Sequence, residues 1–419
     1  MIIQSRKVWL GSSFVPAQIE IDDGGAALYG GENRGKIRRV MKLNAEKCDI
    51  DYGDNWILSG FIDIHTHGAF GFDTNDADPE GLRYWIKNIV AEGVTAIMPT
   101  TATQEKAALK AALKNIAEAG VYVQNADASD FTKSAVERRA SERADAGAEI
   151  LGIHFEGPYI DRKYRGAQAE SAILPPSIEE FKEYQDAAGG LIKYITLSPT
   201  QDRDFEFIRF CAQNGVTVSL GHSDANYGDA IMAMANGARS VTHVYNGMSP
   251  FRHRNAGMTG VSLIENELYG EIICDGLHSS AEAVRLFFNA KGPHRAIMIT
   301  DSLSAKYVNE GKHYKKAAES ALYLAGQRIE LDDSGIARLC QDGTIAGSTL
   351  KMNEGLRFLI EEVGVPREAA INSCTINPAR CIGVGDRKGK ICAGYDADIT
   401  VLGKSYEVLE VYCRGRKAY

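Results

Sequence analysis

The sequence lacks several patterns that assign a protein to a common class. Its eight cysteines include no CxxC pair, which argues against a disulfide framework or a zinc knuckle. No window reaches the roughly 18 apolar residues that crossing a bilayer requires, and the N-terminal stretch MIIQSRKVWLGSS has no long apolar core. A P-loop and a GxSxG elbow are both missing, so NTP-driven and serine-hydrolase chemistry lack their key parts.

The charge balance excludes another class of function. The formal net charge is −8 at pH 7, which argues against a surface built to hold nucleic acid. Together with the absence of a candidate membrane segment, it leads us to expect a cytoplasmic protein with no nucleic-acid or membrane partner. An acidic substrate would need local basic groups.

The composition is that of an ordinary folded protein, with 44% hydrophobic and 24% charged residues. A chain of 419 residues fits one (β/α) barrel of about 250 residues plus a smaller partner. Both ends read as short strands with Gly and Asn turns, and they predict one small β-sandwich domain formed by residues 1–58 and 384–419. Residues 59–383 then form the second domain.

In residues 59–383, apolar runs rich in β-branched residues alternate with stretches of amphipathic helical spacing. This alternation is typical of parallel strands joined by crossover helices, and eight such runs are the number that a closed TIM-like (β/α)8 barrel needs. We therefore predict an α/β fold. The polar segment 125–147 is predicted to be a solvated helix or insertion. The eight strand candidates are residues 60–67, 93–101, 149–158, 191–199, 215–224, 240–247, 270–276 and 295–302.

Each strand candidate is apolar until its C-terminal end, where side chains capable of chemistry appear. All strands of a parallel barrel point the same way, so these ends meet on one face, where the active sites of this fold lie. The strand ends and the positions just beyond them supply His65, His67, His154, Glu156, His222, His243, Asp275, His278 and Asp301.

His65 and His67 have the spacing of a metal-binding pair. Positions i and i+2 of a strand project from the same face about 6 to 7 Å apart, close enough to bind one cation. Imidazole suits zinc or ferrous iron, and a carboxylate such as Glu156 can complete or bridge the site. A single strand-end histidine is equally well explained as a hydrogen-bonded core residue, but six of the nine histidines occupy such ends. His154 is either a further ligand or a group that supports one.

Longer motifs carry a family resemblance over nearly the whole chain. They are SGFIDIHTHG, HFEGPYI, GHSDA, VTHVYNGMSP, DGLHSS, ITDSLSA, AGSTLKMN and the C-terminal NPARCIGVGDRKGKICAGYDADITVL. The sequence resembles the amidohydrolase superfamily and, within it, the N-acetylglucosamine-6-phosphate deacetylases. The resemblance implies hydrolysis of the N-acetyl group of N-acetylglucosamine 6-phosphate to glucosamine 6-phosphate and acetate by metal-activated water.

The resemblance also implies a metal centre with one or two divalent ions per subunit, zinc or iron. Glu156, His222 and His243 would bind the principal ion, and His65 and His67 a second one. The remaining roles fall on Asp301, as a ligand and as the general base and acid, and on His278, near the scissile carbonyl.

For the substrate, the resemblance implies contacts from Asn246 and Gly247 to the sugar phosphate. Arg254 would reach across a homodimer to the phosphate in the neighbouring active site. Gln168, in YRGAQAES, stands where the family usually has a substrate-binding histidine. This departure leaves open a related deacetylase or amidase that acts on another N-acetylated sugar phosphate. A non-catalytic scaffold is less favoured, because such a chain should show gaps among its ligands.

Overall fold

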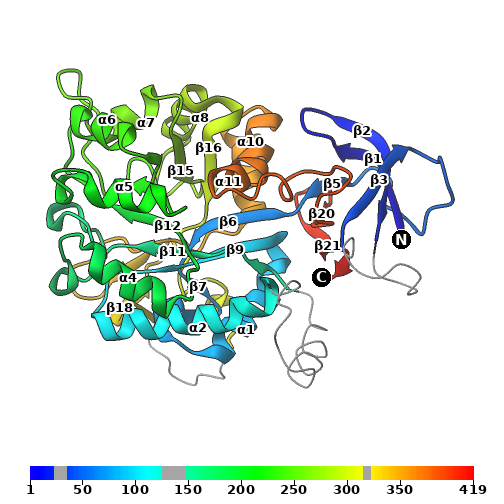
Figure 1. Cartoon of the computed structure of the whole chain (residues 1–419). Helices are drawn as coiled ribbons and strands as arrows, with labels where there is room; N and C mark the ends of the chain where they lie inside the picture. Colours follow the sequence, from blue (N-terminus) through cyan, green and yellow to red (C-terminus); the bar gives the residue numbers. More distant parts are fainter. Residues whose placement is uncertain (23–34, 125–146, 315–321) are drawn as a thin grey trace.

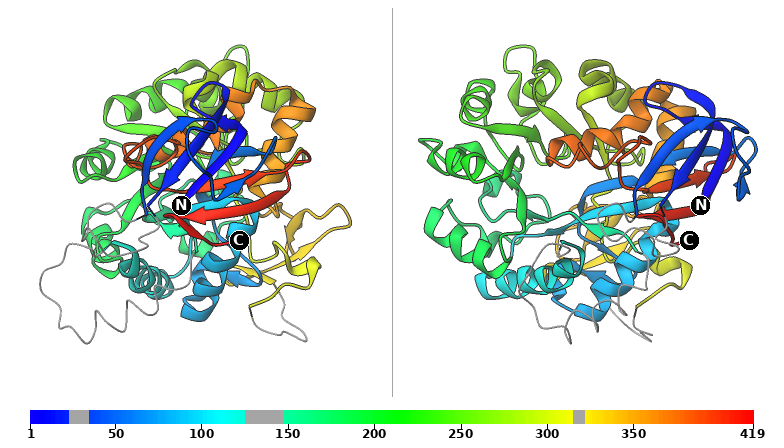
Figure 2. Two further views of the ribbon diagram at one scale, coloured as in Figure 1. Left: turned by 90° about the vertical axis from the view of Figure 1, so that its right-hand side faces the viewer. Right: turned by 45° about the vertical axis from the view of Figure 1, so that its right-hand side comes forward.

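The computed structural model describes residues 1–22, 35–124, 147–314 and 322–419. The chain forms a nearly closed barrel of eight parallel strands with helices around it, and a mixed sheet that contains both termini lies beside the barrel (Figures 1 and 2). This confirms the predicted α/β class and the (β/α)8 barrel. The segment 125–147, predicted as a solvated helix or insertion, lies outside the described residues apart from residue 147.

Each of the eight predicted segments overlaps one barrel strand, and the overlap is smallest for 240–247, because β14 already ends at Val241. The strands pair in parallel in the order β6, β9, β11, β12, β13, β14, β15, β16, and a backbone hydrogen bond from Asp301 N to His65 O (2.9 Å) links the last strand end to the first. Their bounds are β6 (Phe61–Thr66), β9 (Val94–Thr101), β11 (Ile153–Glu156), β12 (Ile192–Leu197), β13 (Thr217–Leu220), β14 (Ala238–Val241), β15 (Tyr269–Ile273) and β16 (Ala296–Ile299).

Part of the barrel interior is apolar. A buried cluster joins Ile62, Met98, Tyr194, Ile273 and Ile297, which come from strands that are not all neighbours in the sheet. Such a cluster fits the inside of a closed sheet, and the carboxyl ends of the strands are left for polar side chains.

Helices pack on the outer face of the barrel (Figure 1). In α1, Asp78 caps the N-terminus by accepting from Glu80 N and Gly81 N, and Leu82 and Trp85 are buried. Among the described residues, no helix combines the length and apolar content needed to cross a bilayer. The helices are α1 (Pro79–Asn88), α2 (Lys106–Gln124), α4 (Ile178–Ala187), α5 (Glu206–Gln213), α6 (Tyr227–Ala235), α7 (Gly257–Ile264), α8 (Ala281–Arg295), α9 (Met352–Arg357), α10 (Arg367–Ser373) and α11 (Ile376–Cys381).

The strands from the two chain ends belong to one continuous mixed sheet (Figure 2). β5 joins its two parts, because it pairs in parallel with β1 and antiparallel with β20 before the chain enters β6. The predicted domain boundaries at 58/59 and 383/384 stay a prediction. The strands of this sheet are β1 (Ile2–Trp9), β2 (Phe14–Ile21), β3 (Ile37–Lys42), β4 (Ile50–Asp51), β5 (Trp56–Ser59), β20 (Ile399–Leu402), β21 (Val408–Cys413) and β22 (Arg416–Lys417).

A small antiparallel sheet follows β16 and packs beside the carboxyl ends of the barrel strands. Its apolar residues contact Ala102, just after β9, and Ala167, and Gln327 Nε2 donates to the carbonyl of Ala167 (2.6 Å). It thereby supports the chain next to the predicted site. Its strands are β17 (Leu322–Leu324), β18 (Gln327–Leu331) and β19 (Ala337–Leu339), and shorter strands elsewhere are β7 (Gly68–Ala69), β8 (Phe72–Asp73) and β10 (Glu149–Ile150).

A buried ion pair fastens the loop that follows β16. Lys306 Nζ lies 2.9 Å from Glu92 Oε1, and both side chains are fully buried. Glu92 precedes β9 in the chain, so the pair connects two barrel segments that are 214 residues apart.

We expect Lys306→Met to lower the free energy of unfolding by about 3–5 kcal/mol, because it leaves the carboxylate of Glu92 buried without its partner. Lys114→Met is the control, since it breaks an exposed pair with Glu118 and should change stability by less than about 0.5 kcal/mol. Denaturant unfolding of both variants checks this. Equal stability of the two would show that the buried pair contributes nothing.

Candidate metal centre

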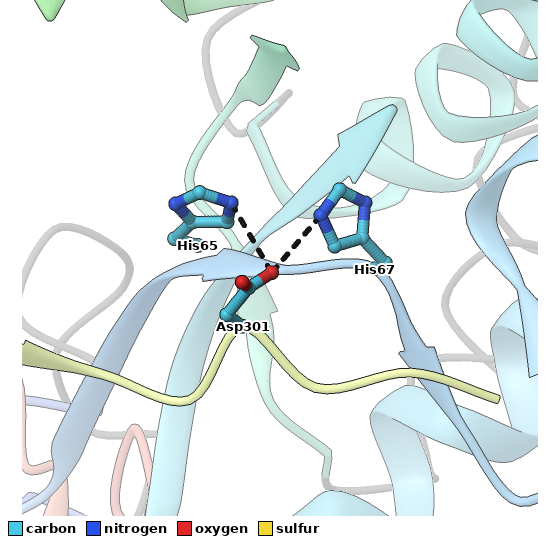
Figure 3. A group of neighbouring side chains, drawn as sticks. All are labelled: His65, His67 and Asp301. Carbon is cyan, nitrogen blue, oxygen red and sulfur yellow. Dashed lines mark ion pairs between the residues drawn. The ribbon is translucent and has the colours of Figure 1, made fainter. Parts of the chain in front are cut away.

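Five barrel strands deliver six side chains to one buried place at their carboxyl ends. Their nitrogen and oxygen atoms form two groups, and within each group the candidate ligand atoms all lie within 4.8 Å of one another. All six side chains are buried. The first group is His65, His67 and Asp301 (Figure 3), and the second is Glu156, His222 and His243.

Glu156 lies between the two groups. Its Oε1 is 3.4 Å from His65 Nε2, and its Oε2 is 3.3 Å from His67 Nε2. Oε1 also lies 3.2 Å from His222 Nε2 and 3.3 Å from His243 Nε2. One carboxylate therefore contacts all four imidazoles, which is the position of a bridging ligand.

The opposite nitrogen of each imidazole is held by an acceptor. His67 Nδ1 lies 3.1 Å from Thr100 O, and His222 Nδ1 lies 2.8 Å from Tyr164 O. His243 Nδ1 lies 3.1 Å from Asn246 O, whereas His65 Nδ1 lies 2.9 Å from a carboxylate, Glu271 Oε2. An acceptor at Nδ1 fixes the proton there, so that each Nε2 lone pair points into the site.

Three of the donors sit on strained backbone. His222, His243 and Asp301 each lie two residues beyond the end of a barrel strand, with φ of 47°, 26° and 49°. Non-glycine residues avoid this left-handed region, at a cost of about 1–3 kcal/mol. Each carbonyl is anchored by a backbone hydrogen bond, and the respective donors are Asp161 N, Asn246 N and Ser348 N. The sharp turn after each strand aims its side chain inward.

The donor set fits a divalent cation. His65 Nε2 is buried and has no hydrogen-bond partner among the described residues. His222 Nε2 and His243 Nε2 are only 3.1 Å apart, although each already uses its Nδ1 in another contact. Lone pairs brought together in this way need a shared cation or proton. Imidazole and carboxylate donors are those of zinc and ferrous iron sites.

Comparison with known proteins decides the family. A family model described as "Amidohydrolase family" matches residues 56–418. The chain belongs to the amidohydrolase family. It is 37% identical to N-acetylglucosamine-6-phosphate deacetylase of Bacillus subtilis (strain 168), and the match covers 93% of this chain and 92% of that protein.

Two further comparisons place this amidohydrolase. It is 29% identical to an N-acetylgalactosamine-6-phosphate deacetylase of Escherichia coli O157:H7, over 86% of this chain and 87% of that one. The structure of a mutant N-acetyl-D-glucosamine-6-phosphate deacetylase from Mycobacterium smegmatis, in complex with N-acetyl-D-glucosamine-6-phosphate, superimposes with a TM-score of 0.84. That match covers 100% of this chain and 99% of the other at 24% identity, and it shows that the two share a fold.

His278 of this amidohydrolase is held by Asp275. The carboxylate contacts His278 Nδ1 (2.7 Å) with one oxygen, and with the other it accepts from the backbone N of Leu277 and His278. Burial lowers the pKa of His278, but the hydrogen bond and charge of Asp275, with the charge of Asp301, raise it above its usual value. These effects favour a protonated imidazole at His278.

The predicted phosphate contacts lie on the chain that follows β14. Asn246 Nδ2 is buried without a hydrogen-bond partner in the part of the chain that the structure describes. Gly247 has a φ of 58°, and an added Cβ would come within 3.0 Å of His222 Nδ1, so the site needs glycine there. Arg254 is exposed on the loop that follows. Their roles in substrate binding stay predictions.

Gln168 contacts the metal centre directly. Its Nε2 donates to Glu156 Oε2 (2.7 Å), and its Oε1 accepts from Thr103 N (2.6 Å). Both ends of the carboxamide thus have protein partners, one of them the carboxylate that lies between the two donor groups. The predicted contact to the sugar stays a prediction.

The structure resolves the open alternatives for His154 and adds two residues. His154 lies between hydroxyls, with Nε2 2.8 Å from Thr196 Oγ1 and Nδ1 3.3 Å from Thr100 Oγ1, so it supports the site and is not in either donor group. Sequence reasoning missed Glu271 and Tyr194, which lie behind His65. The feature that could have revealed Glu271 is an acidic residue in the middle of the apolar run YGEIIC.

Two carboxylates set the charge of the imidazoles. Burial alone lowers the pKa of His67, but hydrogen bonds with Asp301 and Glu156 and the negative charges of both raise it to about 9. Burial raises the pKa of Glu156, but the charge of His65 and the hydrogen bonds with His222, His243 and His65 hold it well below its usual value. In the cation-free protein His67 is therefore protonated at neutral pH.

We expect the affinity of the metal-free protein for Zn²⁺ to rise with pH between 6 and 8. A cation must displace the proton of His67, whose raised pKa keeps it protonated throughout this range, so affinity increases about tenfold per pH unit for each displaced proton. Competition with a chelator at several pH values measures the slope. His67→Asn should reduce it, and a pH-independent wild-type affinity would contradict the expectation.

Proposed function

We propose that this amidohydrolase is a metal-dependent deacetylase that converts N-acetylglucosamine 6-phosphate to glucosamine 6-phosphate and acetate. The observation that carries the proposal is the buried six-donor site with Glu156 between two groups. It occurs in a chain that aligns over 93% of its length with the Bacillus deacetylase at 37% identity. Zinc and iron are the proposed metals, with one ion for each group.

The chemistry needs a nucleophile and a protonated leaving group. A divalent cation held by these residues supplies a Lewis acid that activates water and polarises the amide carbonyl. Asp301 contacts both His65 and His67. Burial raises its pKa, but the charge of His65, together with the hydrogen bond and charge of His67, lowers it below the usual value. We assign it the role of accepting a proton from water and returning it to the sugar nitrogen.

His278 would stabilise the negative charge that develops on the carbonyl oxygen. Asp275 holds one proton at Nδ1, and the raised pKa of His278 favours a second proton at Nε2, which would donate a hydrogen bond to this oxygen. The phosphate would bind the free amide of Asn246, the backbone near Gly247, and Arg254 from the partner subunit of a homodimer. Fixing the phosphate orders the acetamido group over the site and reduces the entropic cost of alignment.

Replacing Asp301 by asparagine keeps a side chain of the same shape but removes the proton acceptor. We expect Asp301→Asn to retain bound metal and to lose about 10²–10⁴-fold in kcat. The rate of acetate release measures kcat, and elemental analysis of the same preparation measures the bound metal. A variant that turns over at the wild-type rate would remove Asp301 from proton transfer.

Arg254→Ala should raise KM for N-acetylglucosamine 6-phosphate about 10–100-fold, because it removes a charge-assisted hydrogen bond to the phosphate. KM for unphosphorylated N-acetylglucosamine should not change. Arg239→Ala, which removes an exposed arginine at the opposite end of β14, is the control. Equal effects on both substrates would contradict a phosphate contact.

Mixing subunits tests whether Arg254 acts across a dimer. A hybrid of Arg254→Ala and Asp301→Asn subunits contains one site with an intact Asp301 that receives an intact Arg254 from its neighbour. We expect such hybrids to recover activity toward the phosphorylated sugar beyond the sum of the parents. If Arg254 acts within its own subunit, no site in the hybrid is complete and no activity returns.

The identity of the sugar is a second question, since the chain is also 29% identical to an N-acetylgalactosamine-6-phosphate deacetylase. The higher identity to the glucosamine enzyme favours N-acetylglucosamine 6-phosphate. Gln168, where the resemblance implies a histidine, is the residue that we propose to affect this choice. Acetate release from both sugar phosphates, compared as kcat/KM, decides between them.

A further inference from the structure

A buried carboxylate lies directly behind the metal centre. Glu271, on β15, is fully buried, and its Oε2 lies 2.9 Å from His65 Nδ1. Among the described residues, its one ion-pair contact is with His65, and no lysine or arginine lies against it. Burying a carboxylate without a cation costs several kcal/mol. Positive charge on His65, or on an ion that His65 binds, would offset this cost.

His65 differs in this respect from the other three imidazoles of the site. His67, His222 and His243 each place Nδ1 against a neutral backbone carbonyl. A full negative charge at Nδ1 holds the proton there more firmly and makes Nε2 a stronger donor to a cation. Glu271 therefore acts on the donor group formed by His65, His67 and Asp301.

Tyr194 and His154 hold this carboxylate and its imidazole in place. Tyr194, on β12, donates its hydroxyl to Glu271 Oε1 (2.6 Å), so both carboxylate oxygens are occupied and the group cannot rotate away. The ring of His154 packs edge-on against His65 (4.5 Å between centroids) and Tyr194 (4.8 Å). Glu271, Tyr194 and His154 form a rigid cradle in the barrel interior.

We propose that Glu271, oriented by Tyr194, is a positioning residue that fixes His65 for cation binding and thereby controls occupancy of the group formed by His65, His67 and Asp301. The imidazoles of His222 and His243 are instead held at Nδ1 by backbone carbonyls, and Glu271 reaches their group through a longer hydrogen bond from His243 N to Oε2 (3.4 Å), so we expect that group to change less. The inference rests on the two-group metal centre proposed above.

Glu271→Gln tests the proposal with minimal change in shape. The amide keeps an acceptor for Tyr194 but turns an N–H toward His65 Nδ1, which favours the other tautomer and places a proton on Nε2. We expect the metal-free variant, titrated with Zn²⁺ in a calorimeter, to bind one equivalent as the wild type does and the other about 10–100-fold more weakly. Tyr194→Phe should shift the same equivalent in the same direction by a smaller factor.

Asp275→Asn is the matched control, since it makes the same change in another carboxylate–histidine pair that belongs to neither donor group. It should leave both Zn²⁺ equivalents unchanged. A double variant shows whether Glu271 acts through His65. In the His65→Ala background, Glu271→Gln should cause no further loss of Zn²⁺ affinity.

The outcomes separate this inference from the proposed function. If wild-type protein binds two equivalents and His65→Ala loses one, while Glu271→Gln and Tyr194→Phe keep both at wild-type affinity, the positioning role is wrong and the metal centre stands. A wild type that binds one equivalent, unaffected by His65→Ala, overturns the two-group centre and this inference with it. If Glu271→Gln does not fold, as judged by circular dichroism, Tyr194→Phe alone decides.

Discussion

The contact of Glu156 with four imidazoles is the interaction on which the site depends. A carboxylate buried to this degree is stable only among groups that carry or bind positive charge, and here four Nε2 atoms surround it at 3.2 to 3.4 Å. No single strand can supply such a set. Four strands of a parallel barrel can, because their carboxyl ends open at the same mouth and each contributes one or two side chains.

The barrel also determines where the site stores strain. His222, His243 and Asp301 follow their strands with a left-handed backbone conformation, which residues other than glycine adopt at a cost in free energy. The turn points the side chain to the barrel axis instead of along the strand. The hydrogen bonds to the three carbonyls and the packing of the apolar cluster offset the free-energy cost of this backbone conformation.

Much of the fold was predictable because its signals are local. Apolar runs that alternate with amphipathic helices gave all eight barrel strands, and polar side chains at the ends of those runs gave the six donors. Contacts distant in sequence left no such signal. The pair of Lys306 with Glu92 spans 214 residues, and Glu271 in YGEIIC does not reveal that its partners are His65 and Tyr194, 206 and 77 residues away. Gln168 was noticed as a departure from the family pattern, but its hydrogen bond to Glu156 depends on how the loop after β11 packs.

The sequence by itself determined the elements and the kind of chemistry, because hydrophobic period fixes strands and helices and residue type fixes which atoms can bind a cation. The family resemblance implied how the histidines divide between two groups, but only the tertiary structure decided that Asp301 joins His65 and His67, that Glu156 contacts imidazoles of both groups, and which nitrogen of each histidine faces the site. These depend on strand register, on the direction of each turn and on acceptors from remote segments. The physical reason is that coordination is a property of atoms a few ångströms apart, and closing the barrel is what brings those atoms together.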